Sequence, residues 1–222
     1  MTCLICGGQA KHQKKFTDIL FLKEEVDSVC SDCWSAFERI EGDYCPSCFK
    51  KGEASLCQDC QYWNSKGKEV SHQALFTYNE AIKEYFSKYK FQGDYLLRVV
   101  FSGPIKKALD VYTDYTIVPI PLSQESYKLR RFNQVIGFLE AAQISYQEIL
   151  AVKKGKKRSS QSSKTRKERL ETPQFFELVT SRLPEKVLLV DDIYTTGKTI
   201  LLARELLHEK GVKKIKSFSL AH

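Results

Sequence analysis

The sequence lacks the features that would mark a membrane or secreted protein. None of its apolar runs approaches the roughly 18 residues of a membrane-spanning helix. The chain also opens without the basic and apolar regions of a signal peptide, so we expect a cytoplasmic protein without a membrane span. Its 222 residues, 42% of them hydrophobic, fit one large and one small globular domain.

The sequence also lacks the glycines of the common nucleotide-binding loops. A Walker A loop ending at Thr199 would need glycine at position 192, where Asp192 stands. A dinucleotide-binding loop would need three glycines, and this stretch contains only Gly197. Both kinds of loop are therefore excluded here.

Residues 187–199 have the sequence VLLVDDIYTTGKT. An apolar run ends there on two adjacent carboxylates, and a turn of small residues then leads into a helical pattern. A strand, a turn and a helix N-terminus hold a phosphate through backbone N–H groups and the helix dipole. The threonines add hydroxyl donors, and the carboxylates can accept hydrogen bonds from ribose hydroxyls. The pattern predicts a ribose 5-phosphate cradle made of Asp191, Asp192, Thr195, Thr196, Gly197, Lys198 and Thr199. The alternative is an ordinary strand-to-helix turn with Asp192 or Thr195 as the N-cap.

All eight cysteines lie in the first 60 residues, as four Cys-x-x-Cys pairs. Each pair can aim two thiolates at one metal ion, so four pairs predict two structural zinc ions with four thiolates each. The candidate ligands are Cys3, Cys6, Cys30, Cys33, Cys45, Cys48, Cys57 and Cys60. Sequential pairing joins the first two pairs and the last two, whereas crossed pairing joins the first pair with the third. The short interval between Cys48 and Cys57 favours the sequential arrangement. Zinc would stabilise a segment with little core of its own, with contact to a partner or nucleic acid as a further role.

The remaining sequence predicts an α/β domain. Polar residues 64–68 suggest a boundary, which gives a zinc module at 1–66 and a second domain at 70–222, each with its own interior. Strands are expected at 74–78, 116–121, 148–152, 186–190 and 214–220, and helices from Asn79, at 95–101, from Pro104 and through 132–139. This alternation implies a mainly parallel sheet covered on both faces. Ligands of such sheets bind beyond the carboxyl ends of the strands, where Asp191 and Pro121 would lie.

The net charge of +8 is concentrated in one segment. Residues 153–169 hold nine basic residues and one acid, so the rest of the chain balances 26 basic against 26 acidic groups. Such a segment can follow a single-stranded nucleic acid backbone, with Tyr127, Phe132 and Tyr146 as stacking platforms nearby. The candidate DNA-binding residues are Lys153, Lys154, Lys156, Lys157, Arg158, Lys164 and Arg166. The alternative is a loop that only covers the ribose phosphate site.

The loop at 190–199 closely resembles the phosphoribosyl pyrophosphate loop of type I phosphoribosyltransferases, and with the cysteine pairs the whole chain resembles the ComF family of late competence proteins. The resemblance implies a Rossmann-like type I phosphoribosyltransferase fold behind a small N-terminal double zinc ribbon. It implies that phosphoribosyl pyrophosphate binds with Mg²⁺, and that Pro121, Arg130 and Arg131 contribute to this site. The two arginines are expected at a helix start, and Gln161 and Arg169 on a mobile loop.

The same resemblance implies a role in bacterial DNA uptake. A ComF protein would support natural transformation, binding single-stranded DNA beside a helicase-like, ComFA-type ATPase. The alternative is an active phosphoribosyltransferase in nucleotide metabolism or salvage, although the sequence contains no identifiable acceptor-base site.

Overall fold

The computed structural model describes residues 2–10, 28–153 and 173–222. Of the candidate DNA-binding residues, only Lys153 lies within these ranges; Gln161 and Arg169 also lie outside them. In the part of the chain that is described, no helix combines the length and the apolar character of a membrane crossing.

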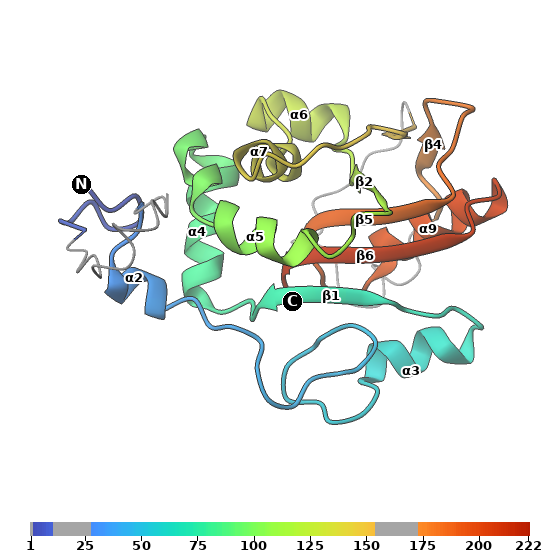
Figure 1. Ribbon diagram of the computed structural model, residues 1–222, viewed down its shortest axis with the longest axis horizontal. Coiled ribbons are helices and arrows are strands. Elements are labelled where there is room, and N and C mark those ends of the chain that lie inside the picture. Colours follow the sequence, from blue (N-terminus) through green and yellow to red (C-terminus); the bar gives the residue numbers. More distant parts are fainter. Residues whose placement is uncertain (1, 11–27, 154–172) are drawn as a thin grey trace.

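The centre of the molecule is a four-stranded parallel sheet in the order β1-β6-β5-β2 (Figure 1). Its strands are β1 (His72–Phe76), β2 (Thr116–Pro119), β5 (Lys186–Ile193) and β6 (Lys214–Ala221). All interior residues of β5 are buried, as expected for a strand covered on both faces. The parallel α/β sheet predicted from the sequence is therefore confirmed.

Side chains alternate between two buried clusters along β5, one on each face of the sheet. Leu188 and Val190 pack with α4 (Glu80–Phe91), α5 (Ser102–Leu109) and α7 (Gln134–Ala141). Val187 and Leu189 pack with α9 (Lys198–Glu209) on the other face. These helices cover the two faces and leave the carboxyl ends of the strands at one shared edge.

Several helices match their sequence signals, and others differ. Asn79 caps α4 as predicted, its side chain accepting the N–H of Ile82 at 3.1 Å. Residues 95–99, by contrast, form a short 3₁₀ helix, η1 (Tyr95–Val99). A helix that the sequence did not predict, α6 (Gln124–Arg130), precedes α7, and the side chain of Ser123 caps it. Because Arg130 ends α6 and Arg131 follows with φ 69°, the expectation that these arginines stand at a helix start was wrong.

The strand expected at 148–152 belongs to a separate sheet. β3 (Leu150–Val152) pairs antiparallel with β4 (Phe176–Leu178), so it adds nothing to the parallel sheet. A short apolar run reveals a strand but carries no information about its partner. Directly after β3, the N–H of Lys153 donates to the carbonyl of Phe175 at 2.9 Å.

The cysteine segments are packed onto the α/β part of the molecule. α2 (Ser31–Ser35) lies beside α4, and α3 (Gln58–Ser65) lies next to the sheet on the side of β1 (Figure 1). Cys3 and Phe37 share a buried cluster with Phe76, whereas Cys45 shares the other cluster with Tyr194. The expectation that each domain has its own interior was therefore wrong, because a segment this small fills its core from its neighbour.

Candidate functional site

The turn between β5 and α9 has the geometry of an anion site. β5 ends at Ile193, and α9 begins at Lys198 with Gly197 as its N-cap and no side-chain cap. An ordinary turn capped by Asp192 or Thr195 is therefore excluded. The N-terminus of a helix, with the N–H groups of its first turn and the positive end of its dipole, favours a negatively charged ligand.

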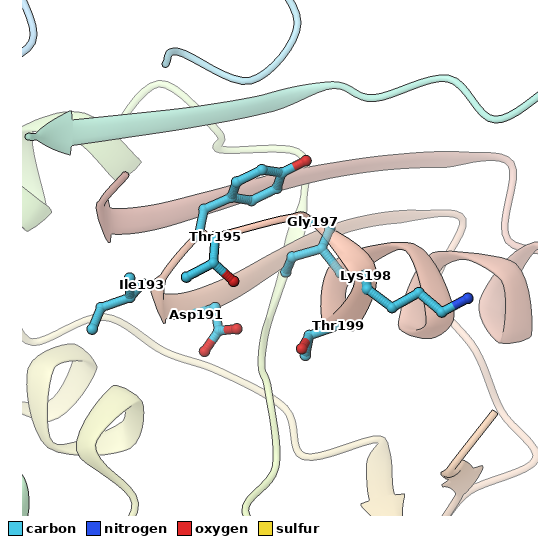
Figure 2. A pocket seen from close by; sticks show the side chains of 8 residues that line it. Asp191, Ile193, Thr195, Gly197, Lys198 and Thr199 are labelled. Carbon is cyan, nitrogen blue, oxygen red and sulfur yellow. The ribbon is translucent and has the colours of Figure 1, made fainter. Parts of the chain in front are cut away.

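A pocket lies at this turn, and most of the predicted cradle lines it. Asp191, Thr195 and Thr199 gather on one side of the turn, while the Lys198 side chain extends along α9 away from them (Figure 2). The complete lining is Asp191, Ile193, Tyr194, Thr195, Gly197, Lys198, Thr199 and Ile200. Asp192 and Thr196, also predicted for the cradle, are buried and do not line the pocket. The pocket thus combines a carboxylate, hydroxyls and a helix N-terminus.

The turn requires glycine at position 197 for two reasons. Gly197 has φ 75°, a conformation that side chains disfavour. A Cβ at this position would also lie 2.0 Å from the Tyr194 hydroxyl oxygen. Gly197 therefore lets the backbone pass close to Tyr194 and turn into α9.

The carboxylate of Asp192 is held from behind the pocket. Lys90 Nζ forms an ion pair with its Oδ2 at 2.5 Å, Gln134 Nε2 donates to the same oxygen at 2.6 Å, and the N–H of Ile193 donates to Oδ1 at 2.6 Å. Burial by itself would raise the pKa of Asp192, but Lys90, with support from Arg130 and Gln134, holds that pKa below its ordinary value. Burial in turn lowers the pKa of Lys90. Asp192 of β5 is thus a charged group that Lys90 of α4 and Gln134 of α7 hold in place.

Sequence reasoning missed Lys90, although a signal was present. Lys90 stands four residues after Phe86 and eight after Ile82, which places it on the apolar face of α4. Its side chain is buried, and Nζ lies 4.2 Å from the centre of the Phe86 ring. A lysine on a buried helix face needs a partner of opposite charge, and Asp192 provides it.

The eight cysteines gather into the two sets of the sequential pairing. Within each set the four sulfur atoms lie within 4.8 Å of one another: Cys3, Cys6, Cys30 and Cys33; and Cys45, Cys48, Cys57 and Cys60. Tetrahedral zinc with Zn–S bonds of about 2.3 Å places its sulfurs about 3.8 Å apart. The measured separations of 3.9 Å for Cys6–Cys30 and 3.6 Å for Cys48–Cys57 fit that geometry. The crossed pairing is excluded, and each set has room for one zinc ion.

Backbone hydrogen bonds prepare these thiols for a metal. The N–H of Cys30 donates to Cys3 Sγ at 3.3 Å, and the N–H of Cys57 donates to Cys45 Sγ at 3.4 Å. Burial raises the pKa of both acceptor thiols, but these and neighbouring N–H groups outweigh it and lower the pKa of Cys3 to about 6 and that of Cys45 to about 7. One thiol in each cluster, Cys3 or Cys45, thus favours the thiolate form that zinc needs, whereas burial raises the pKa of Cys33 and Cys57, and a hydrogen bond with Cys60 raises that of Cys48.

Comparison with known proteins agrees with this geometry. The family model of the phosphoribosyl transferase domain matches residues 129–222, which include the β5–α9 turn. Competence protein ComFC of Streptococcus pneumoniae is 48% identical over 99% of both chains. Competence protein ComFC of Bacillus subtilis is 30% identical, over 99% of this chain and 94% of that protein.

The chain belongs to the ComFC family. The sequence resemblance is thereby confirmed, as is a phosphoribosyltransferase-type α/β domain in a competence protein. Among solved structures, a hypoxanthine phosphoribosyltransferase from Staphylococcus aureus is 18% identical, with a TM-score of 0.35, over 55% of this chain and 61% of that one. That likeness is too low to add to the assignment.

Other candidate residues of this ComFC family member lie around the turn but do not line its pocket. Pro121 follows β2, whose end lies beside that of β5, since the N–H of Ile120 donates to the carbonyl of Val190 at 2.8 Å. Arg130 Nη1 donates to Gln134 Oε1 at 2.9 Å and so extends the network around Asp192. Arg131 is exposed. Both arginines therefore stand at the α6–α7 junction, and Arg130 contributes to the network around Asp192.

The expected stacking platforms differ in access. Tyr127 is 54% exposed, whereas Phe132 packs between Tyr89 and Tyr95 at ring distances of 5.1 and 5.0 Å. Tyr146 is half-buried, and its hydroxyl donates to Glu140 at 3.4 Å. Of the three, Tyr127 offers the most open ring.

Proposed function

We propose that this ComFC family member binds phosphoribosyl pyrophosphate with Mg²⁺ at the β5–α9 turn and single-stranded DNA through residues 153–169, in support of natural transformation. One observation carries the first half of the proposal: the α9 N-terminus has no side-chain cap and opens into a pocket that Asp191 also lines. A phosphate beside a carboxylate matches a phosphorylated ribose, because the helix N-terminus attracts the anion and the carboxylate accepts from sugar hydroxyls.

We assign the roles within the site from these positions. The N–H groups of the first turn of α9, with the hydroxyls of Thr195 and Thr199, hold the 5-phosphate. Asp191 accepts from the ribose hydroxyls, and Asp192, already bonded by Lys90 and Gln134, keeps the end of β5 in place. Pro121 and the two arginines at the α6–α7 junction form the pyrophosphate side. Mg²⁺ would neutralise part of the pyrophosphate charge.

The two cysteine clusters hold one zinc ion each in this account, on the fit of their sulfur distances. Their role is to fold the N-terminal segment against the sheet. The proposed partner protein is a helicase-like ATPase of the ComFA type, which would deliver the single strand.

DNA binding is proposed to depend mainly on the charges of the basic segment, residues 153–169. If about five of its nine cations contact phosphates, the slope of log K against log salt is about −3.5 for a single strand. Replacing Lys156, Lys157 and Arg158 by alanine should flatten that slope by about two units and weaken all sequences alike. If the triple variant binds single-stranded DNA with the parent's affinity and slope, the segment only covers the ribose phosphate site.

The second candidate is an active phosphoribosyltransferase in nucleotide metabolism or salvage, which the match to the phosphoribosyl transferase domain favours. Two measurements on one preparation separate the candidates: thermal stabilisation by Mg²⁺ and phosphoribosyl pyrophosphate, and release of pyrophosphate with a panel of bases. We expect stabilisation without release. Release with one base would establish the transferase, and the absence of stabilisation would remove the ligand from this site.

A further inference from the structure

The helix that carries part of the second cysteine cluster contacts the turn between β5 and α9. Cys57 is the N-cap of helix α3, and Cys60 lies in its first turn, so two cysteines of that cluster fix the start of the helix. Trp63 stands one turn further along, where it is 2% exposed. Its indole N–H donates to the backbone carbonyl of Thr196 at 2.7 Å. A tryptophan in the zinc-ribbon segment thus holds the backbone of the turn itself.

This hydrogen bond fixes the direction of a donor in the turn. In a planar trans peptide the C=O and the following N–H point to opposite sides. Because Trp63 binds the carbonyl of Thr196, the N–H of Gly197 is directed away from Trp63. Gly197 is the N-cap of α9 and lines the pocket. The orientation of this peptide therefore decides whether that N–H can serve an anion.

A second contact runs from the same cluster to the other side of the turn. His222 Nε2 lies 3.2 Å from Cys48 Sγ, and the His222 ring lies 4.8 Å from that of Tyr194. The Tyr194 hydroxyl packs against Gly197, where there is no room for a Cβ. Two separate paths thus join the second cluster to Gly197.

The first cluster has different neighbours. Within the described ranges its helix, α2, carries Trp34, whose ring packs against Phe76 and Phe101, 6.2 and 5.8 Å away. Lys88 of α4 donates to the carbonyl of Ile5 at 2.9 Å. These contacts belong to the α4 side of the sheet, so the two clusters should affect the turn differently.

We propose that the second cluster, with Trp63 as a positioning residue, holds the phosphate-binding turn in its binding conformation. Metal in this cluster therefore sets the affinity for phosphoribosyl pyrophosphate, whereas metal in the first cluster does not. The ligand named here rests on the proposed function, but the order of the turn can be measured without it.

Hydrogen–deuterium exchange on the zinc-loaded full-length protein tests the proposal. The chain offers matched pairs: Trp63→Phe against Trp34→Phe, and Cys57→Ser against Cys30→Ser, since Cys30 caps α2 as Cys57 caps α3. We expect the amides of Tyr194 and Leu201, which donate to the carbonyls of Ala221 and Gly197 at 2.9 Å, to exchange roughly three- to tenfold faster in the second-cluster variants, the range set by one hydrogen bond. Both first-cluster variants should keep the parent's rate at these amides. Affinity for phosphoribosyl pyrophosphate should fall by a similar factor in Trp63→Phe and should stay at the parent's value in Trp34→Phe.

The amides of β5 provide the internal check on folding. Faster exchange at Tyr194 and Leu201 with unchanged β5 supports the proposal, and the cysteine pair decides it if Trp63→Phe does not fold. Parental exchange of the turn in folded Trp63→Phe overturns it, as does equal loosening of β5 and the turn. Equal effects of Cys30→Ser and Cys57→Ser also overturn it. If the parent protein binds no phosphoribosyl pyrophosphate, the proposed function fails while the exchange comparison still decides the coupling.

Discussion

Replacement of Lys90 by methionine tests the buried charge pair behind the site. Methionine keeps an apolar stem of similar length but removes the ammonium, which leaves Asp192 7% exposed with no paired cation from α4. Breaking a buried ion pair by removing one partner costs about 3–5 kcal/mol, because the remaining charge stays desolvated. That is a large share of the roughly 5–15 kcal/mol by which a typical protein is stable.

The matched control is Lys83→Met on the same helix. Lys83 pairs with Glu80 at 3.1 Å, but its side chain is 59% exposed, so its loss should cost less than about 1 kcal/mol. Urea unfolding of the zinc-loaded proteins gives both free energies from the midpoint and slope. The double variant Lys90→Met with Asp192→Asn removes both charges and should recover part of the loss.

The pH dependence of the stability lost in Lys90→Met provides an independent test. In the parent, Asp192 has a pKa below its ordinary 3.8, so its contribution is present above that value and is lost as the pH falls through the folded pKa. Without Lys90, burial raises the pKa of Asp192 in the folded state. As the pH falls, Asp192 is therefore protonated in the folded protein before it is protonated in the unfolded one. The deficit of Lys90→Met should therefore shrink as the pH is lowered. A deficit no larger than that of Lys83→Met at neutral pH would refute the reasoning.

Three further predictions follow from the same structure. Gly197→Ala should destabilise the protein by about 1–3 kcal/mol in urea unfolding, because position 197 has a positive φ and a Cβ there would meet the Tyr194 hydroxyl. The control Gly103→Ala should be near neutral, since position 103 has open space and an ordinary φ. Equal effects of the two substitutions would contradict the account of the turn. Burial, with a smaller effect of the neighbouring His222, holds the pKa of His72 well below 6.5, so only the unfolded state takes up its proton as the pH falls below 6.5. The stability that neutral His72 contributes is thus full above pH 6.5 and falls below it. His72→Gln should reduce the loss of unfolding free energy between pH 6.5 and 5.5 by about 1 kcal/mol. An unchanged dependence of that free energy on pH would contradict this. Metal analysis should give two zinc ions per chain, and one ion, none, or disulfides in their place would reject the two sites.

The sequence revealed the features whose chemistry is local. Four Cys-x-x-Cys pairs and the strand–turn–helix pattern at 187–199 each lie within a few residues, so their spacing predicted the two cysteine clusters and the turn between β5 and α9. The parallel sheet followed from the alternation of apolar strands and amphipathic helices. Each of these signals can be read from residues that lie close together in the sequence.

The missed features depend on contacts between distant residues. Lys90 and Asp192 are 102 positions apart, and Trp63 and Thr196 are 133 apart, so no local pattern links them. The shared interiors of the cysteine segments and the sheet were missed for the same reason. The antiparallel pairing of β3 with β4 likewise depends on which edge a short strand finds.

The central claim is that phosphoribosyl pyrophosphate binds at the β5–α9 turn. Calorimetric titration with Mg²⁺ and this ligand, into the parent protein, Asp191→Ala and the exposed control Asp110→Ala, tests it most directly. Asp191→Ala removes an acceptor for the ribose hydroxyls, and hydrogen bonds to charged groups contribute about 1.5–3 kcal/mol. The account predicts one saturable site in the parent and in Asp110→Ala, with affinity roughly ten- to a hundred-fold lower in Asp191→Ala. No binding by the parent, or equal affinity in Asp191→Ala, would contradict it.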